Sequence, residues 1–380
     1  MKPWTPVVIA LTMLLAACTN WDDPQTVRAQ RADSATGDIV IGAVWPWSSA
    51  RGNLWQGIEL AVDEINASGG LLNRKLRIDK QDDESSLAKG LVIAQQFADN
   101  LDMVAVIGHY NSYIALPAAA TYQSAGLVYL TPGATSYQIN NLGHNMVFRS
   151  VPSNRSLGNR IAENMAAKGL RRVAIFYKKE KSSQDIANYF EQRGRELGLT
   201  IVDRRSFMQG SQDFSNAIQN WKDLYQFDAV FLAANVPEAA YFISQMRKMG
   251  LSVPIFGDHG LDTRQLFEIA GSAAEGVFVT DSTIQEDNWP AYQHFNKIFT
   301  QKYHQAAGAS AAKGYDAVNL LAQAIRQANS TVPAKIAQAL HSTSKWPGAS
   351  GEFTFDEKGD IPDKKIGMKV VHGDKFEMTQ

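Results

Sequence analysis

The sequence predicts an α/β fold made of two lobes, each built on a doubly wound, mostly parallel sheet. Short β-rich runs alternate with amphipathic helical runs, and the alternation occurs in two separate series, at 39–130 and 172–279. Alternation of this kind requires right-handed crossovers, which place helices on both faces of a parallel sheet. At roughly 150 residues per domain, a chain of 380 residues is long enough for two or three domains with cores of their own.

The first series predicts one lobe. Apolar residues recur at helical spacing in the first helix, and the pair Gly69-Gly70 after it supplies a left-handed cap. The expected strands are 39–44, 76–78, 104–107 and 127–130, and the expected helices between them are 54–65, 87–98 and 114–123.

The second series predicts the other lobe, with strands at 172–177, 199–206, 229–232, 253–256 and 276–279. After Asp287 the pattern is mostly helical, at 292–305, 311–328 and 333–340, with no strand to cross over to. We therefore expect these helices to pack on the first sheet. In the tail, 351–356 and 364–371 alternate with period two around 357–360, which predicts a hairpin.

Composition excludes several classes of protein. Lys+Arg 37 against Asp+Glu 38 gives a net charge of −1, whereas a nucleic-acid binder needs a clear excess of basic residues. The single cysteine excludes an intramolecular disulfide and a cysteine-based zinc site. Aromatic residues at 10% and charged residues at 20% exclude general disorder.

The N-terminus predicts export. Residues 1–17 have the positive start and short apolar run of a signal peptide, and this run is too short to span a bilayer, which needs about 20 apolar residues. The run ends in Leu15-Ala16-Ala17-Cys18, which resembles the bacterial lipobox; this implies that Cys18 is acylated and becomes the first mature residue. The alternative is an ordinary secretory signal with an incidental cysteine. We expect 18–37 to be a flexible tether and the protein to be lipid-anchored in the periplasm, at either membrane.

Catalytic motifs are missing from the sequence. It contains no Gly-x-Ser-x-Gly, no Gly-x-Gly-x-x-Gly and no Gly-x-x-x-x-Gly-Lys-Ser/Thr, and its seven histidines never form an i, i+4 pair. This favours a binding protein over an enzyme, and we predict no cofactor and no metal site.

Two strand ends carry hydroxyl residues. Ser112 follows the strand at 104–107, and Thr135 follows Gly133 after the strand at 127–130. In open α/β sheets, ligands bind outside the carboxyl ends of the strands, where N–H groups favour an anion. Two neighbouring loops of this kind predict a carboxylate site, although either loop alone is better explained by ordinary helix capping.

Several motifs in order resemble the leucine/isoleucine/valine-binding protein family, the type I periplasmic binding proteins of branched-chain amino acid ABC transporters. They are 66–70 with Asp82-Asp83, 106–112, 131–135, 271–280 and 351–360, and the similarity covers 38–371. The resemblance implies two lobes that close on a ligand by hinge motion, and a monomer that delivers it to ABC permease and ATPase subunits.

The resemblance also implies the division of the chain. Lobe 1 would comprise 38–150 plus 284–348, and lobe 2 would comprise 151–283 plus 349–380. The three crossovers would lie near 149–153, 280–284 and 347–352.

Carried over residue by residue, the α-carboxylate of the ligand would be held by Ser112, Gly133, Ala134 and Thr135. Other positions depart from the family. His259 stands where the family has the acid that pairs with the ligand ammonium, with Asp258 beside it as a substitute. The aligned tyrosine positions carry Ser182, Asn235 and, in the first lobe, Arg51; the paired cysteines align with Ser85 and Asn111.

These departures widen the expected ligand class. Aromatic residues near the strand ends could stack on a flat or apolar ligand, and Arg51 could pair with a second carboxylate. The aromatic residues are Trp45, Trp47, Tyr110, Tyr113 and Tyr137. An aromatic acid, a dicarboxylate or an amino-acid derivative therefore competes with leucine-like ligands. Two other classes stay open: a sensor or assembly lipoprotein without a transporter, and a hydrolase with its site in the cleft.

Overall fold

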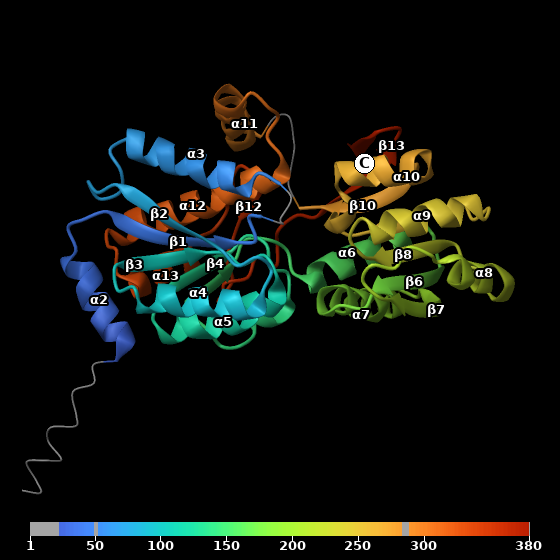
Figure 1. Ribbon diagram of the computed structural model, residues 1–380, viewed down its shortest axis with the longest axis horizontal. Helices are drawn as coiled ribbons and strands as arrows, with labels where there is room; N and C mark the ends of the chain where they lie inside the picture. The colour runs from blue at the N-terminus through green and yellow to red at the C-terminus, as the bar shows by residue number, and fades with distance from the viewer. Residues whose placement is uncertain (1–22, 49–51, 283–288, 380) are drawn as a thin grey trace, which may run out of the picture.

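A computed structural model of the protein describes residues 23–48, 52–282 and 289–379. The chain forms two α/β lobes that lie side by side (Figure 1). Each lobe has its own mostly parallel sheet with helices on both faces, which confirms the predicted fold class.

Lobe 1 is a five-stranded parallel sheet in the order β2-β1-β3-β4-β5. Its strands are β1 (Ile39–Trp45), β2 (Leu76–Asp82), β3 (Met103–Ile107), β4 (Val128–Thr131) and β5 (Val147–Arg149). Helices α4 (Leu87–Asp99) and α5 (Ser112–Ser124) cover one face, and α3 (Leu54–Ala67), α12 (Ala309–Ala328) and α13 (Pro333–His341) cover the other. Helix α11 (Pro290–Tyr303) packs outside α3 and α12.

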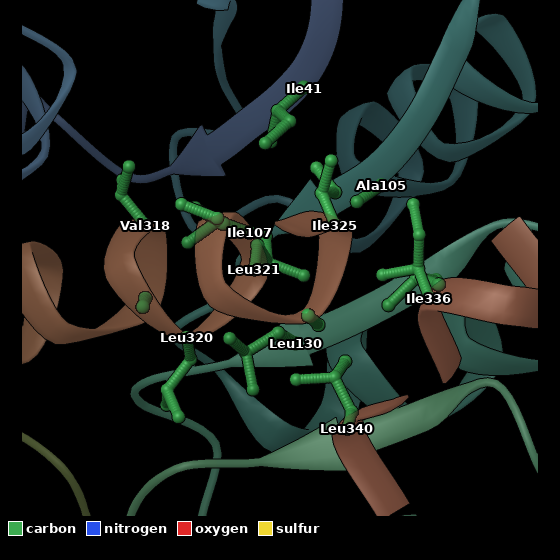
Figure 2. Close-up of a cluster of buried hydrophobic side chains, with 14 of the residues drawn as sticks. Ile41, Ala105, Ile107, Leu130, Val318, Leu320, Leu321, Ile325, Ile336 and Leu340 are labelled. Atoms are coloured by element: carbon green, nitrogen blue, oxygen red, sulfur yellow. The ribbon is translucent and has the colours of Figure 1, made fainter. Parts of the chain in front are cut away.

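The late helices complete the core of lobe 1, as their pattern predicted. In Figure 2, side chains of α12 such as Leu321 and Ile325, and Ile336 of α13, point toward Ile107 and Leu130 on the strands. All of them are buried, so the sheet is sealed by helices that are some 200 residues distant in the sequence from its strands. Burial of apolar area on this scale is the dominant favourable term in folding.

Lobe 2 contains the seven-stranded sheet β14-β13-β10-β9-β8-β6-β7. Strands β6 (Arg172–Lys178), β7 (Thr200–Phe207), β8 (Ala229–Ala233), β9 (Ile255–Gly257) and β10 (Val277–Asp281) are parallel, and β13 (Gly367–His372) and β14 (Lys375–Met378) are antiparallel. Helices α6 (Asn154–Ala167) and α7 (Lys181–Glu196) cover one face. Helices α8 (Ser215–Leu224), α9 (Glu238–Lys248) and α10 (Arg264–Ala270) cover the other.

The prediction of a hairpin between 351–356 and 364–371 is wrong. β12 (Gly351–Phe353) pairs with β11 (Trp346–Gly348), and Phe353, Phe355 and Ile361 are buried in the core of lobe 1. β13 instead joins the sheet of lobe 2 beside β10. Residues 349–361 therefore belong to lobe 1, and the third crossover lies at 362–366, later in the chain than the resemblance placed it.

The prediction of a flexible tether is also wrong for part of 18–37. Helix α2 (Pro24–Ser34) lies against lobe 1 (Figure 1), and its Arg28 is 1% exposed. Arg28 Nη1 donates to the backbone oxygens of Asn100 and Met103 at 2.7 Å, Nε donates to that of Ala125 at 2.8 Å, and Nη2 donates to that of Ala98.

The predicted signal peptide, Cys18 and Arg51 lie outside the described residues. Within the part of the chain that is described, no helix combines the length and apolarity needed to cross a bilayer.

Candidate functional site

The carboxyl ends of both parallel sheets face a shared cavity of about 480 Å³ between the lobes. Lobe 1 contributes residues at the end of β1, in the loops after β3 and β4, and on the first turns of α12; lobe 2 contributes residues after β8, β9 and β10. The polar and aromatic lining residues include Trp45, Tyr110, Gly133, Thr135, Ser310 and Lys313 from lobe 1, and Asn235, His259, Asp262, Thr263, Gln265 and Asp281 from lobe 2.

Aromatic packing shapes the wall of lobe 1. The rings of Trp45 and Tyr110 lie 5.1 Å apart between centroids. A Cβ atom on Gly133 would lie 2.3 Å from the Trp45 ring and 3.1 Å from the Tyr110 ring, so only glycine allows the loop after β4 to approach both. The two aromatic neighbours thus explain why glycine occupies position 133.

The loop after β4 is held by the hydroxyl of Thr131. Its Oγ1 accepts from the backbone N–H of Gly133 at 3.3 Å and of Ala134 at 3.0 Å, and donates to the backbone oxygen of His109 at 3.1 Å. Two of the backbone donors that we expected to face a carboxylate are therefore already occupied. Thr135 lines the cavity, and among the described residues no hydrogen bond engages its hydroxyl.

On lobe 2, Asn235 and His259 line the cavity together. Gly260 packs tightly on Asn235, because a Cβ there would lie 2.0 Å from the Asn235 side-chain oxygen. Burial, reinforced by the charge of Lys313, lowers the pKa of His259 to about 4, so its imidazole is neutral at pH 7. Asp258 is not among the residues that line the cavity: its carboxylate accepts from the Gly260 N–H at 2.6 Å, and burial raises its pKa to about 6.

Charged side chains meet at the lobe 2 wall. The ammonium of Lys369, on β13, lies 2.9 Å from a carboxylate oxygen of Asp262 and 2.8 Å from one of Asp281. Burial opposes the charge of Lys369, but the two acids outweigh it and raise its pKa. Within the described residues, no group of three or more His, Cys, Asp or Glu side chains is arranged to hold a metal ion.

The sequence-predicted site residues separate into two groups. Gly133, Thr135, Asn235 and His259 line the cavity, as do Trp45 and Tyr110. The others are placed elsewhere among the described residues: Ser112, Ala134, Tyr113, Trp47, Tyr137 and Ser182.

Most of these displaced side chains have bonding partners of their own. The hydroxyl of Ser112 accepts from the Ser136 N–H at 3.2 Å, and that of Ser182 accepts from the Asn154 side chain at 3.2 Å. Tyr113 donates to the backbone oxygen of Ser85 at 2.6 Å.

The remaining two aromatic residues also bond away from the cavity. Trp47 donates to the backbone oxygen of Gln81 at 2.8 Å. Tyr137 accepts from Arg155 at 3.1 Å across the two lobes.

The pair of residues aligned with cysteines of the family is in direct contact. The Asn111 side-chain amide donates to the Ser85 hydroxyl at 2.9 Å. A hydrogen bond thus joins the two loops that the resemblance implied to be adjacent.

Asp281 and Lys313 were missed by the sequence reasoning. Asp281 is the last residue of β10, so the same strand-end argument that selected Thr135 could have found it. Lys313 lies on a helix that follows no strand of its own lobe, and only the packing of α12 on lobe 1 brings it to the cavity.

Comparisons with known proteins agree with this geometry. The sequence profile of the periplasmic binding protein family matches residues 38–372. An amino acid binding protein of Pseudomonas aeruginosa is 28% identical over 356 residues, covering 89% of this chain and 90% of that protein. The Leu/Ile/Val-binding protein of Escherichia coli K12 is 28% identical over 335 residues, covering 88% and 90%.

Solved structures share the fold. An ABC transporter substrate-binding protein from Desulfitobacterium hafniense, determined in complex with Leu, is 36% identical with a TM-score of 0.82 and covers 90% of this chain and 100% of its own. A leucine binding protein from Thermotoga maritima is 26% identical with a TM-score of 0.81, covering 90% and 98%.

Proposed function

The chain belongs to the periplasmic binding protein family, and on that premise we propose that it is the substrate-binding component of an ABC importer. It captures an amino acid or a related small carboxylate. The observation that carries this proposal is the cavity of about 480 Å³, which lies between two lobes and is lined by the strand ends of both. The relatives named for amino acid binding, and the structure in complex with Leu, support the ligand class.

Binding begins at the hydroxyl of Thr135, which donates to the carboxylate of the ligand. Thr135 is 8% exposed and lines the cavity, so a hydrogen bond formed there is largely shielded from water. Bonds of this kind to a charged group are worth about 1.5–3 kcal/mol. Asn235 and the neutral His259 contact the ligand from lobe 2, and Trp45 and Tyr110 pack on its apolar part.

Closure follows from the two-sided site. A ligand that touches both lobes binds the closed form more tightly than the open form, and this differential affinity shifts the population toward closure. The closed form then docks on the permease of the transporter, whose ATPase subunits supply the energy for import.

The family name places the chain outside the cytoplasm, and we propose that lipid on Cys18 anchors it to a membrane. The family is one of binding proteins, and the chain releases its ligand unchanged rather than hydrolysing it. A monomer suffices, because both walls of the cavity come from one chain.

A thermal-shift screen tests the function. The chain from Thr19 onward is heated with amino acids, aromatic acids and dicarboxylates, because a ligand at 100 times its Kd stabilises the folded state by about 2.7 kcal/mol. At least one small carboxylate should raise the melting temperature. If none does, while all remain chemically intact, the proposed ligand class is wrong.

Isothermal titration then tests the placement of the carboxylate. Loss of the Thr135 hydroxyl in Thr135→Val should weaken the best ligand by about 10- to 100-fold, the equivalent of one hydrogen bond to a charge. Thr200→Val is the control, since Thr200 is exposed at the start of β7 and far from the cavity lining. Equal affinity of both variants would show that the carboxylate binds elsewhere.

A further inference from the structure

Among the described residues that line the cavity, Lys313 is a cation that the proposed function does not use. Lys313 lies on the first turns of α12, on the same side of the helix as Ala309 and Ser310, and all three line the cavity from lobe 1.

Close helix packing fixes the position of Lys313. A Cβ atom on Gly57 would lie 1.9 Å from the backbone oxygen of Ala311, and one on Gly314 would lie 2.3 Å from that of Leu54. Helices α3 and α12 therefore cross in backbone contact on either side of Lys313. The first turns of α12 cannot shift far without separating this contact, so the lysine is carried on a rigid part of the lobe.

Lys313 has no hydrogen-bond or ion-pair partner in the part of the chain that the structure describes. The acids nearest in the electrostatic sense are Asp281 and Asp262, and the ammonium of Lys369 lies against both, at 2.8 and 2.9 Å. Burial lowers the pKa of Lys313 despite their attraction, which means that the charged form is incompletely compensated.

Polar groups of the opposite wall, on lobe 2, also lack hydrogen-bond partners among the described residues. Thr263 Oγ1 and Gln265 Oε1 are such groups, and they line the cavity and are shielded from solvent. Polar atoms buried in this way are normally bonded, so their presence with an unpaired lysine in one cavity indicates a polar ligand.

We propose that Lys313 pairs with a second anionic group of the ligand, so that the protein selects acidic amino acids or dicarboxylates over apolar amino acids. This rests on the proposed function, because the first carboxylate is assigned to Thr135. A desolvated ammonium favours such a ligand strongly, since a charge-assisted bond inside a closed cavity is worth more than the same bond in water. It disfavours an aliphatic side chain, which would leave the ammonium buried and unpaired.

Matched pairs of ligands test the selection. Isothermal titration compares L-glutamate with L-glutamine and L-aspartate with L-asparagine, because each pair differs in charge and hardly in shape. The wild-type protein should bind at least one acid about tenfold or more tightly than its amide. Lys313→Met should abolish that preference by weakening the acid about tenfold or more, with the affinity for the amide nearly unchanged.

Two further variants make the outcome decisive. Lys335→Met removes the same charge from an exposed position on α13 and should leave the preference intact. Lys313→Arg keeps a cation and should retain a preference for the acid even if Lys313→Met does not fold.

The possible results separate the two proposals. Binding of leucine-like ligands but not of acids would overturn this inference and leave the proposed function standing. Equal weakening of acid and amide in Lys313→Met would place the first carboxylate, not a second anion, at Lys313, and would also overturn it. Binding of no carboxylate at all would instead contradict the proposed function.

Discussion

His259 shows how burial changes the role of a residue that the sequence singled out. The position aligns with an acid of the family, and a neutral imidazole cannot replace that acid as a counter-ion. Burial first, and then the charge of Lys313, lowers its pKa to about 4 from 6.5. The unfolded chain therefore binds more protons than the folded chain between about pH 4 and 6.5, and this residue costs stability as the pH falls through that window.

We predict that His259→Gln loses less stability than the wild type when the pH is lowered from 7 to 4.5. Urea unfolding at several pH values measures this. Asp258 has the opposite effect on the pH dependence of stability, because burial raises its pKa to about 6 from 3.8. The quantity to compare is therefore the difference in unfolding free energy between variant and wild type at each pH. His304→Asn, at an exposed left-handed position after α11, is the control. Parallel pH profiles for wild type and His259→Gln would refute the assignment.

The candidate site was predictable from sequence where it depends on strand ends. Thr135, Asn235 and His259 each follow a buried strand, and the carboxyl ends of parallel strands meet at one edge. Lys313 could not be predicted, because its place depends on how two helices cross. Ser112 follows a strand too, but its hydroxyl accepts from the Ser136 N–H. The spacing of residues in the sequence does not show that this backbone group, rather than a ligand, engages the hydroxyl.

At the level of elements, helix α2 docks through a single buried guanidinium. Arg28 reaches backbone oxygens at the C-terminal ends of α4 and α5, where orphan carbonyls and the helix dipoles favour a cation. Burial lowers its pKa to about 10, with Asp99 opposing, so the carbonyls replace most of its hydration.

Arg28→Ala should destabilise lobe 1 by about 2–4 kcal/mol, because it removes bonds to a charged donor and leaves buried carbonyls unpaired. Chemical unfolding, with limited proteolysis of the N-terminal segment, measures the loss. The matched control is Arg31→Ala on the same helix, whose ion pair with Asp102 is about half exposed on both sides and should contribute little to stability, since water screens it. Similar small losses in both variants would mean that the Arg28 guanidinium does not anchor α2.

The sequence predicted where the strands lie better than it predicted which strands pair with one another. Buried parallel strands such as β1 and β3 are continuous apolar runs, which identify them without any knowledge of the fold. In the tail, 351–353 and 367–371 are strands, as the period-two alternation predicts, but this alternation does not say which sheet a strand joins. Helix α2 left no apolar stripe in the sequence, because Arg28 rather than a hydrophobic face anchors it.

In the whole molecule, the hydrophobic cores of the two lobes are separate. The described clusters around α12 and α5 draw only on lobe 1, and those around α9 and α7 draw only on lobe 2. A buried ion pair joins the two segments of lobe 1 that lead into the first and third crossovers. The Arg149 guanidinium pairs with Asp360 and donates to the Ser136 backbone oxygen at 2.6 Å. Hinge motion can therefore occur at the crossovers without disturbing either core.

Separate cores predict separable unfolding, and a ligand held by both lobes should change it in a defined way. By calorimetry, the ligand-free protein should show two overlapping transitions, and Arg28→Ala should lower only the one that belongs to lobe 1. A ligand at 100 times its Kd should raise both by about 5–10 °C, because unfolding of either lobe destroys the site. A shift of one transition alone would mean that the ligand binds to one lobe and does not drive closure, whatever its affinity.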